Sequence, residues 1–342
     1  AAVTMGVTEE LDATRKALPA DQALVSFALT TWRIAALVVE AKGTRVVDLG
    51  DVASVRKLLE TLRLDDPDQD PTGTVAALRA RLTRPLALGK HIERVLISPT
   101  GPLGYVPFGM LLPDREVVYV PSATALGLLR DLPGGSGRAV LALGDPVYGR
   151  GTHGNLPAPP ATAREVNAIG TERLLGAQAT EAGLRERLGT NASWRAVHLA
   201  CHGLVDTEHA MQSSLALTQS APDDGHLTVY EVFKLRMATD LVVLSACETG
   251  KGRIYQTEGI LGLASGFMFA GAPRVICSLW KVDDAATQAL MVKFYELWNP
   301  KDRSQGIGAA AALKAAQAYI RAQPKWEHPY YWAAWVLWGL PD

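Results

Sequence analysis

The chain has 342 residues and a formal net charge of -1, and its residues are 48% hydrophobic and 20% charged. This balance is that of an ordinary globular protein with one large domain or two lobes. It gives no support to binding of nucleic acid or of an anionic membrane surface, so we expect neither as a direct partner. The two most apolar stretches, 259–272 and 330–340, are shorter than the roughly 20 residues of a membrane-spanning helix.

The cysteine content indicates the compartment. Cys201, Cys247 and Cys277 are the only cysteines, and such a sparse, odd set argues against a disulfide framework. We therefore expect a reducing, cytoplasmic location. The N-terminal segment has no apolar signal-peptide core. Because the chain begins with Ala rather than Met, we also expect it to be a piece of a longer protein with further domains upstream.

The first part of the chain alternates between strand and helix patterns. Residues 23–30 and 34–41 predict two adjacent strands joined by a short polar turn. Residues 51–64 have apolar side chains at helical spacing, with Asp51 as a plausible N-cap. The remaining predictions for this part are strands at 94–99 and 116–121 and helices at 73–89 and 122–132, the last capped by Ser122.

A Gly/Pro/Ser-rich linker at 133–138 is the best candidate for a domain boundary. We therefore assign residues 1–135 to an N-terminal lobe and residues 136–342 to a C-terminal lobe. The first lobe also alternates strands with helices, so we interpret it as a second lobe of similar design without catalytic residues.

Beyond the linker, strand and helix alternate again, and the strands are apolar throughout. This pattern is typical of a mostly parallel sheet covered on both faces. The expected fold class is therefore α/β, with a mostly parallel central sheet flanked by helices. Its expected strands are 139–145, 196–203, 240–247 and 273–280, and its expected helices are 161–170, 180–189, 227–235, 258–271, 283–298 and 304–320.

Two strand ends of the second lobe carry reactive side chains. One strand ends at His202 and Gly203, and another ends at Cys247. Reactive groups in α/β sheets collect beyond the carboxyl ends of the strands. A thiolate attacks a carbonyl carbon while a nearby imidazole handles the protons. We therefore predict Cys247 as nucleophile and His202 as acid–base partner, with the backbone N–H groups of Gly203 and Cys247 as oxyanion hole.

Other interpretations of these residues stay open at this point. A cysteine in an apolar strand is usually a small core residue, which is our interpretation of Cys201 and Cys277. His198 lies inside its strand and suits a buried supporting role. His198 and His202 together resemble a zinc pair only if their segment is helical, and it lacks a metalloprotease glutamate. The loop 144–151 lacks the Lys-Ser/Thr end of a phosphate loop. We expect no metal and no cofactor.

At these motifs the sequence resembles the CHAT family, bacterial relatives of caspases and separases. The ordered set of matching segments extends from about Leu24 to Gly339 and comprises 95–112, 118–129, HLACHG at 198–203, LVVLSACETGKG at 241–252, 258–287, 291–298 and 328–339. The family often has Thr where Cys201 stands, a change that we expect to leave catalysis intact.

The resemblance implies a caspase-like fold with a silent N-terminal lobe, an active C-terminal lobe and a His202/Cys247 dyad. It implies an endopeptidase that acts on a specific protein target in bacterial defence or cell-fate control. Family members commonly carry tetratricopeptide repeats or sensor modules that hold the peptidase in check, so we expect such a regulatory partner. A non-catalytic adaptor and a metal-dependent hydrolase remain the competing hypotheses.

The substrate preference depends on an acidic pair. WKVDD at 280–284 resembles the separase segment WDVTD, in which the acidic residue helps to bind a basic side chain before the cleaved bond. Asp284 is the closer match and Asp283 its neighbour, and a partly desolvated carboxylate pairs well with Arg. Alternatively, the pair caps the helix 283–298, where acidic residues suit the N-terminal dipole. A preference for Leu or Met also stays open.

Overall fold

The computed structural model consists of two compact units. One comprises Ala1–Asp131 with Val336–Asp342, and the other comprises Leu132–Trp335. The residues that the structure describes are 11–132, 135, 137–149, 156–157, 160–190, 193–206, 208–248, 259–300 and 303–342; at 160, 247, 248, 259, 260 and 303 only the backbone is described.

The division differs from the expected lobes 1–135 and 136–342 at the boundary, where the first unit ends at Asp131, and in the last seven residues. Val336–Asp342 group with the first unit because strand β13 (Trp335–Gly339) runs parallel to β5 (Glu116–Tyr119), with Trp338 opposite Tyr119. Arg94 also forms an ion pair with Asp342 at 2.6 Å. The end of the chain therefore completes a sheet that begins more than two hundred residues earlier.

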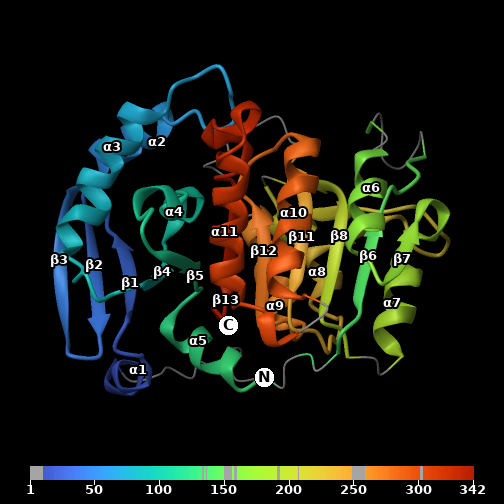
Figure 1. Cartoon of the computed structure of the whole chain (residues 1–342), viewed down its shortest axis with the longest axis horizontal. Helices are drawn as coiled ribbons and strands as arrows, with labels where there is room; N and C mark the ends of the chain where they lie inside the picture. Colours follow the sequence, from blue (N-terminus) through green and yellow to red (C-terminus); the bar gives the residue numbers. More distant parts are fainter. Residues whose placement is uncertain are drawn as a thin grey trace. The chain divides into compact units, whose positions relative to one another are not determined.

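The first unit is built on an antiparallel meander that continues as a parallel sheet (Figure 1). The expected hairpin is confirmed as β1 (Gln22–Leu29) and β2 (Arg33–Glu40), and β3 (Gly43–Asp51) pairs antiparallel with β2. On the other side, β1 runs parallel to β4 (Arg94–Ser98), and β4 to β5. Its helices are α1 (Leu11–Ala17), α2 (Val52–Thr61), α3 (Thr72–Leu78), α4 (Phe108–Leu111) and α5 (Ala123–Arg130).

Both expected N-caps of the first unit are present. The Asp51 carboxylate accepts the Ser54 N–H at 2.7 Å, and the Ser122 hydroxyl accepts the Ala125 N–H at 3.0 Å. Each bond satisfies one of the donors that the first turn of a helix leaves without an intrahelical partner.

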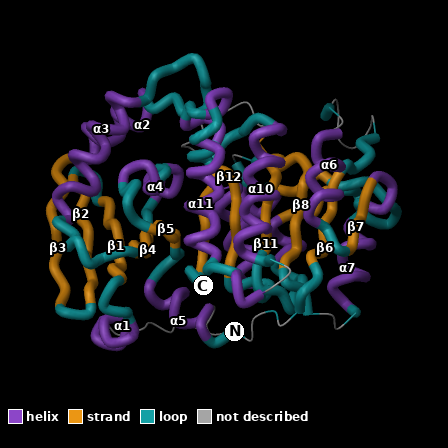
Figure 2. Tube along the Cα trace, in the orientation of Figure 1, coloured by secondary structure: helices purple, strands orange, loops and turns teal. Residues whose placement is uncertain are grey.

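The second unit contains a mostly parallel sheet flanked by helices, as expected. Figure 2 shows its strands side by side, with α6, α10 and α11 along one face. Strands β7, β6, β8, β11 and β12 run parallel in this order, and the short β9–β10 hairpin continues the sheet beside the end of β8. Their bounds are β6 (Val140–Gly144), β7 (Glu172–Leu175), β8 (Ala196–Leu204), β9 (Ser214–Ala216), β10 (His226–Thr228), β11 (Val242–Glu248) and β12 (Arg274–Ser278).

The helices of this unit follow the strands in chain order: α6 (Pro160–Ile169), α7 (Glu181–Gly189), α8 (Val229–Val232), α9 (Gly259–Phe269), α10 (Asp284–Trp298) and α11 (Ala309–Arg321). The strands β6 and β12 are buried at every position, which explains why they read as continuous apolar runs. In the part of the chain that the structure describes, no helix has both the length and the apolar character needed to cross a bilayer.

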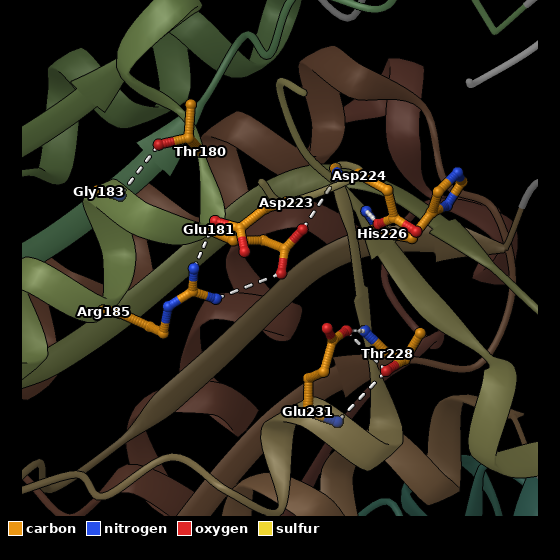
Figure 3. Close-up of polar contacts among 10 residues, drawn as sticks. Thr180, Glu181, Gly183, Arg185, Asp223, Asp224, His226, Thr228 and Glu231 are labelled. Carbon is orange, nitrogen blue, oxygen red and sulfur yellow. Dashed lines mark hydrogen bonds and ion pairs between the residues drawn. The ribbon is translucent and has the colours of Figure 1, made fainter. Parts of the chain in front are cut away.

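One expected helix is largely wrong. Residues 227–235 form the end of β10 and then only the short α8. The helix begins at a capping box, in which the Thr228 hydroxyl accepts the Glu231 N–H and the Glu231 carboxylate accepts the Thr228 N–H (Figure 3). This box fixes the first turn after Thr228, and the residues before it remain free to pair with β9.

Candidate active site

The register of two parallel strands brings the predicted catalytic positions together. β8 and β11 are neighbours, and Cys247 in β11 lies directly opposite His202 in β8. Adjacent strands are about 4.8 Å apart, so the two backbones are within reach of one shared reaction centre. The side chain of Cys247 and the segment 249–258 lie outside the described part of the structure.

The imidazole of His202 is held by a loop far away in the sequence. Its Nε2 lies 3.0 Å from the carbonyl oxygen of Pro157. A carbonyl oxygen can only accept, so Nε2 carries the hydrogen in the neutral ring, and Nδ1 is left as the proton acceptor. The bond therefore selects the tautomer as well as the orientation of the ring.

Tyr148 supports the same histidine. Its hydroxyl accepts the backbone N–H of His202 at 3.2 Å, and the two ring centroids are 5.5 Å apart. Burial raises the pKa of the Tyr148 phenol well above its ordinary value, with a smaller contribution from Cys201. The hydroxyl thus stays protonated, and it also lies 3.3 Å from the carbonyl oxygen of Ala216 in β9, to which it can donate.

The environment of His202 favours its neutral form. Its pKa is lowered below the ordinary value of 6.5, chiefly because burial disfavours the charged ring, and Lys281 acts in the same direction. The Pro157 carbonyl and the Asp284 carboxylate oppose this shift without reversing it. A neutral imidazole at pH 7 is ready to accept a proton, which suits a general base.

The two residues of the acidic pair, Asp283 and Asp284, have different surroundings. Asp283 is the N-cap of α10, and its carboxylate accepts the Ala286 N–H at 2.9 Å. Asp284 is the first residue of the helix and is exposed. Its charge acts on the pKa of His202, so the Asp284 carboxylate lies within electrostatic range of the imidazole.

Gly203, the expected oxyanion-hole residue, lies within a strand rather than at its end. β8 continues to Leu204, and Gly203 stands opposite Glu248 of β11 and Leu215 of β9. The turn that we expected after this strand therefore begins later, because the β9 strand pairs with the residues that follow the apolar run.

The β9–β10 hairpin beside His202 is anchored to α7 by a buried carboxylate (Figure 3). Glu181 is 1% exposed, and its Oε1 accepts the Gly225 N–H at 3.0 Å. Arg185 forms ion pairs with Glu181 and with Asp223. Burial raises the pKa of Glu181, and the neighbouring carboxylates of Glu231 and Asp223 add to this effect.

The side chains of Cys201, Cys277 and His198 are buried, as expected. Cys201 is 4% and Cys277 is 0% exposed, and burial raises the pKa of each thiol to about 12. Such thiols are inert toward electrophiles at neutral pH. His198 is 0% exposed, and its Nε2 lies 3.0 Å from Glu165 Oε1. It faces a carboxylate inside the protein instead of forming a zinc pair with His202.

Among the described residues, Tyr148 and Pro157 contact His202 and were missed by sequence reasoning. Both lie in the Gly/Pro-rich loop after β6, and Pro157 acts through its backbone carbonyl. A backbone acceptor leaves no residue-type signal, and a tyrosine in a loop has no periodicity. The available signal was the position of this loop at the carboxyl end of β6, beside the strand that carries His202.

The structure is similar to separase in the Saccharomyces cerevisiae separase–securin complex, with a TM-score of 0.60 and 12% identity over 96% of this chain and 31% of that chain. This likeness shows a caspase-like fold, as expected. The CHAT domain family model matches residues 72–340. The chain therefore belongs to the CHAT domain family, as the resemblance of its motifs indicated.

Its relatives include much longer proteins. Tetratricopeptide repeat protein 28 of Mus musculus and of Homo sapiens is 26% identical to this chain over an alignment of 305 residues. The match covers 74% of this chain. The chain spans only 12% of the length of each of these relatives.

Proposed function

We propose that this chain is a cysteine endopeptidase that uses Cys247 as nucleophile and His202 as its acid–base partner. The observation that carries the proposal is the alignment of the two positions across β8 and β11, combined with the Pro157 carbonyl on His202 Nε2. This combination supplies a nucleophile position and an oriented base, which are the two parts of an activated thiol.

In the proposed mechanism, the Cys247 thiolate attacks the carbonyl carbon of the scissile peptide while His202 Nδ1 holds the thiol proton. The tetrahedral oxyanion is stabilised by the backbone N–H groups of Gly203 and Cys247. The oxyanion then collapses, the C–N bond breaks, and His202 gives its proton to the leaving amine. Water attacks the acyl-enzyme, His202 accepts the water proton, and the acid product leaves as the thiolate is restored.

The test is incubation of the chain with a diverse peptide library, with cleavage read by mass spectrometry. The matched control is the Cys247→Ala chain, prepared in parallel. Products that appear only with Cys247 present support the endopeptidase. Identical products with both chains would contradict Cys247 as the nucleophile, and binding without products would favour the adaptor hypothesis.

We infer that a repeat or sensor module regulates the peptidase, which acts on a protein target in defence or cell-fate control. The support for a repeat module is that the curated relatives are tetratricopeptide repeat proteins of which this chain spans only 12%. The buried free thiols of Cys201 and Cys277 suit a reducing compartment such as the cytoplasm. The assignment of residues 1–135 as a silent lobe and 136–342 as the catalytic lobe belongs to the same proposal.

We expect the acid limb of the pH–rate profile to lie below pH 6.5, the ordinary value for histidine. The base must be neutral, and a lowered pKa keeps His202 neutral to a lower pH, so activity is lost only as the pH falls through that lowered value. Measurement of kcat/KM against pH with a library-derived peptide checks this expectation.

Two charged neighbours of His202 allow a control, because they shift its pKa in opposite directions. Lys281 lowers the His202 pKa and Asp284 raises it. Lys281→Gln should therefore move the acid limb to higher pH, and Asp284→Asn should move it to lower pH. If the acid limb moved in the same direction in both variants, it would belong to a group other than His202.

We expect the peptidase to cut after Arg or Lys, with Asp284 pairing to the basic side chain. Asp284 is exposed, so water screens its ion pair with a substrate Arg. Asp284→Asn should therefore lower kcat/KM for an Arg substrate by about fivefold, which corresponds to the loss of roughly 1 kcal/mol for an exposed ion pair. A fully buried pair would cost more. Cleavage of a Leu substrate should hardly change. Cleavage of the library mainly after Leu or Met would instead make the pocket apolar.

A further inference from the structure

A buried polar cluster that the proposed mechanism does not use lies in the same unit as the dyad. The Nε2 atom of His198 in β8 is 3.0 Å from the Oε1 atom of Glu165 in α6, and these side chains are 0% and 4% exposed. The Nδ1 atom of His198 is 3.4 Å from the hydroxyl of Tyr295 in α10. Buried ionisable groups are costly unless they are paired, so the cluster holds three separate elements together.

The hydrogen positions of the cluster follow from chemistry. Burial raises the pKa of Tyr295, and the Glu165 charge raises it further, so the phenol keeps its proton. The Tyr295 hydroxyl can then donate to His198 Nδ1, so His198 Nε2 carries the hydrogen. Nε2 lies 3.0 Å from Glu165 Oε1, but the two atoms do not have hydrogen-bond geometry, so the contact is a close electrostatic one. The side chains form one chain of contacts from α10 through β8 to α6.

Each of these three elements is also connected to His202. β8 carries His202 four positions after His198, and alternation along a strand places both on one face of the sheet. α6 begins at Pro160, three residues after the Pro157 carbonyl that holds the His202 ring. α10 begins at Asp284, whose charge acts on the His202 pKa.

We propose that Glu165, acting through His198 and Tyr295, is a positioning residue for the catalytic dyad. The inference rests on the proposed function of Cys247 and His202. If the carboxylate is lost, α6 and α10 are no longer tied to the same point of β8, and the Pro157 carbonyl moves relative to the His202 ring. Glu165 is buried, so we expect its effect to reach the reaction through His202.

The experiment measures alkylation of Cys247 by iodoacetamide at neutral pH, followed by mass spectrometry of the modified peptide. It needs no substrate, and the buried thiols of Cys201 and Cys277, whose pKa values are about 12, should stay unmodified. Glu165→Gln keeps the side-chain volume and removes the charge. We expect it to slow alkylation roughly 10- to 100-fold, the scale for displacing a catalytic group by about 1 Å.

Two further variants separate positioning from folding. Tyr295→Phe removes a single oxygen and leaves the ring in place, so it tests the cluster in a chain that stays folded, and we expect a smaller slowing in the same direction. Asp240→Asn is the matched control, because this carboxylate belongs to a similarly enclosed ion cluster at the opposite ends of the strands. Alkylation of its folded chain should proceed at the wild-type rate.

The double variant Glu165→Gln/His202→Ala identifies the route of the effect. If Glu165 acts through His202, the double variant alkylates no more slowly than His202→Ala alone. Equal slowing by Glu165→Gln with and without His202 would overturn the inference, as would wild-type rates in both Glu165→Gln and Tyr295→Phe. His202→Ala with a wild-type rate would instead overturn the dyad itself, and the inference with it.

Discussion

Replacing Cys247 by Ala, or His202 by Ala, should each lower peptide cleavage by at least about 1000-fold while leaving the fold intact. The thiol forms the covalent bond to the substrate, and the imidazole moves every proton of the cycle. Because the two groups act as a unit, the double variant should be no worse than either single variant. The measurement is kcat/KM for a peptide found in the library, with circular dichroism to verify folding.

The other two cysteines provide the matched controls for this prediction. Cys201→Ser and Cys277→Ser alter buried thiols and should retain cleavage in the folded fraction. They should lose stability, because a buried hydroxyl needs a hydrogen-bond partner that a thiol does not require. Cleavage at the wild-type rate by Cys247→Ala would contradict the peptidase mechanism outright.

The sequence predicted most of the long apolar strands, but it missed β13, which is buried at every position, and several more exposed or shorter strands. β8 and β11 were visible as apolar runs, and since both are parallel strands of one sheet, His202 and Cys247 were expected at one edge. β3 was missed because its residues alternate between exposed and partly buried, with Val46 75% exposed. The short strands β7 and β9 owe their pairing to neighbours, which no local pattern records.

The supporting contacts of the site depend on tertiary structure that residue types do not reveal. Pro157 acts through a carbonyl 45 residues before His202, and Tyr295 lies 97 residues after His198. For the acidic pair, the sequence left capping and substrate binding equally open, and the Ala286 N–H on Asp283 assigns one carboxylate to capping. The role of Asp284 stays a prediction.

Asp240 should make a large contribution to stability at the end of the sheet away from the dyad. It forms ion pairs with Arg195, which directly precedes β8, and with Arg274, which begins β12. The Arg195 guanidinium also lies 3.8 Å from the ring centre of Trp298, the last residue of α10. The carboxylate thus joins the amino ends of neighbouring strands to a covering helix.

We expect Asp240→Asn to lower the free energy of unfolding of the second unit by about 3 kcal/mol, the range for removing one partner of a buried ion pair. The substitution leaves two largely enclosed guanidinium groups, with 16% and 8% side-chain exposure, facing a neutral amide instead of a carboxylate. Each then keeps its desolvation cost without the Asp240 charge. Chemical denaturation monitored by tryptophan fluorescence measures the change.

Glu296→Gln is the matched control, because Glu296 pairs with Lys293 on the surface of α10 and is 59% exposed. Water screens that pair, so its loss should have little effect on unfolding. If Asp240→Asn were as mild as Glu296→Gln, water would have to reach the Asp240 cluster and screen it in the same way. A large loss of stability with normal Cys247 alkylation in the folded chain would instead separate the two ends of the sheet: the Asp240 cluster stabilises the fold, and the Glu165 cluster positions His202.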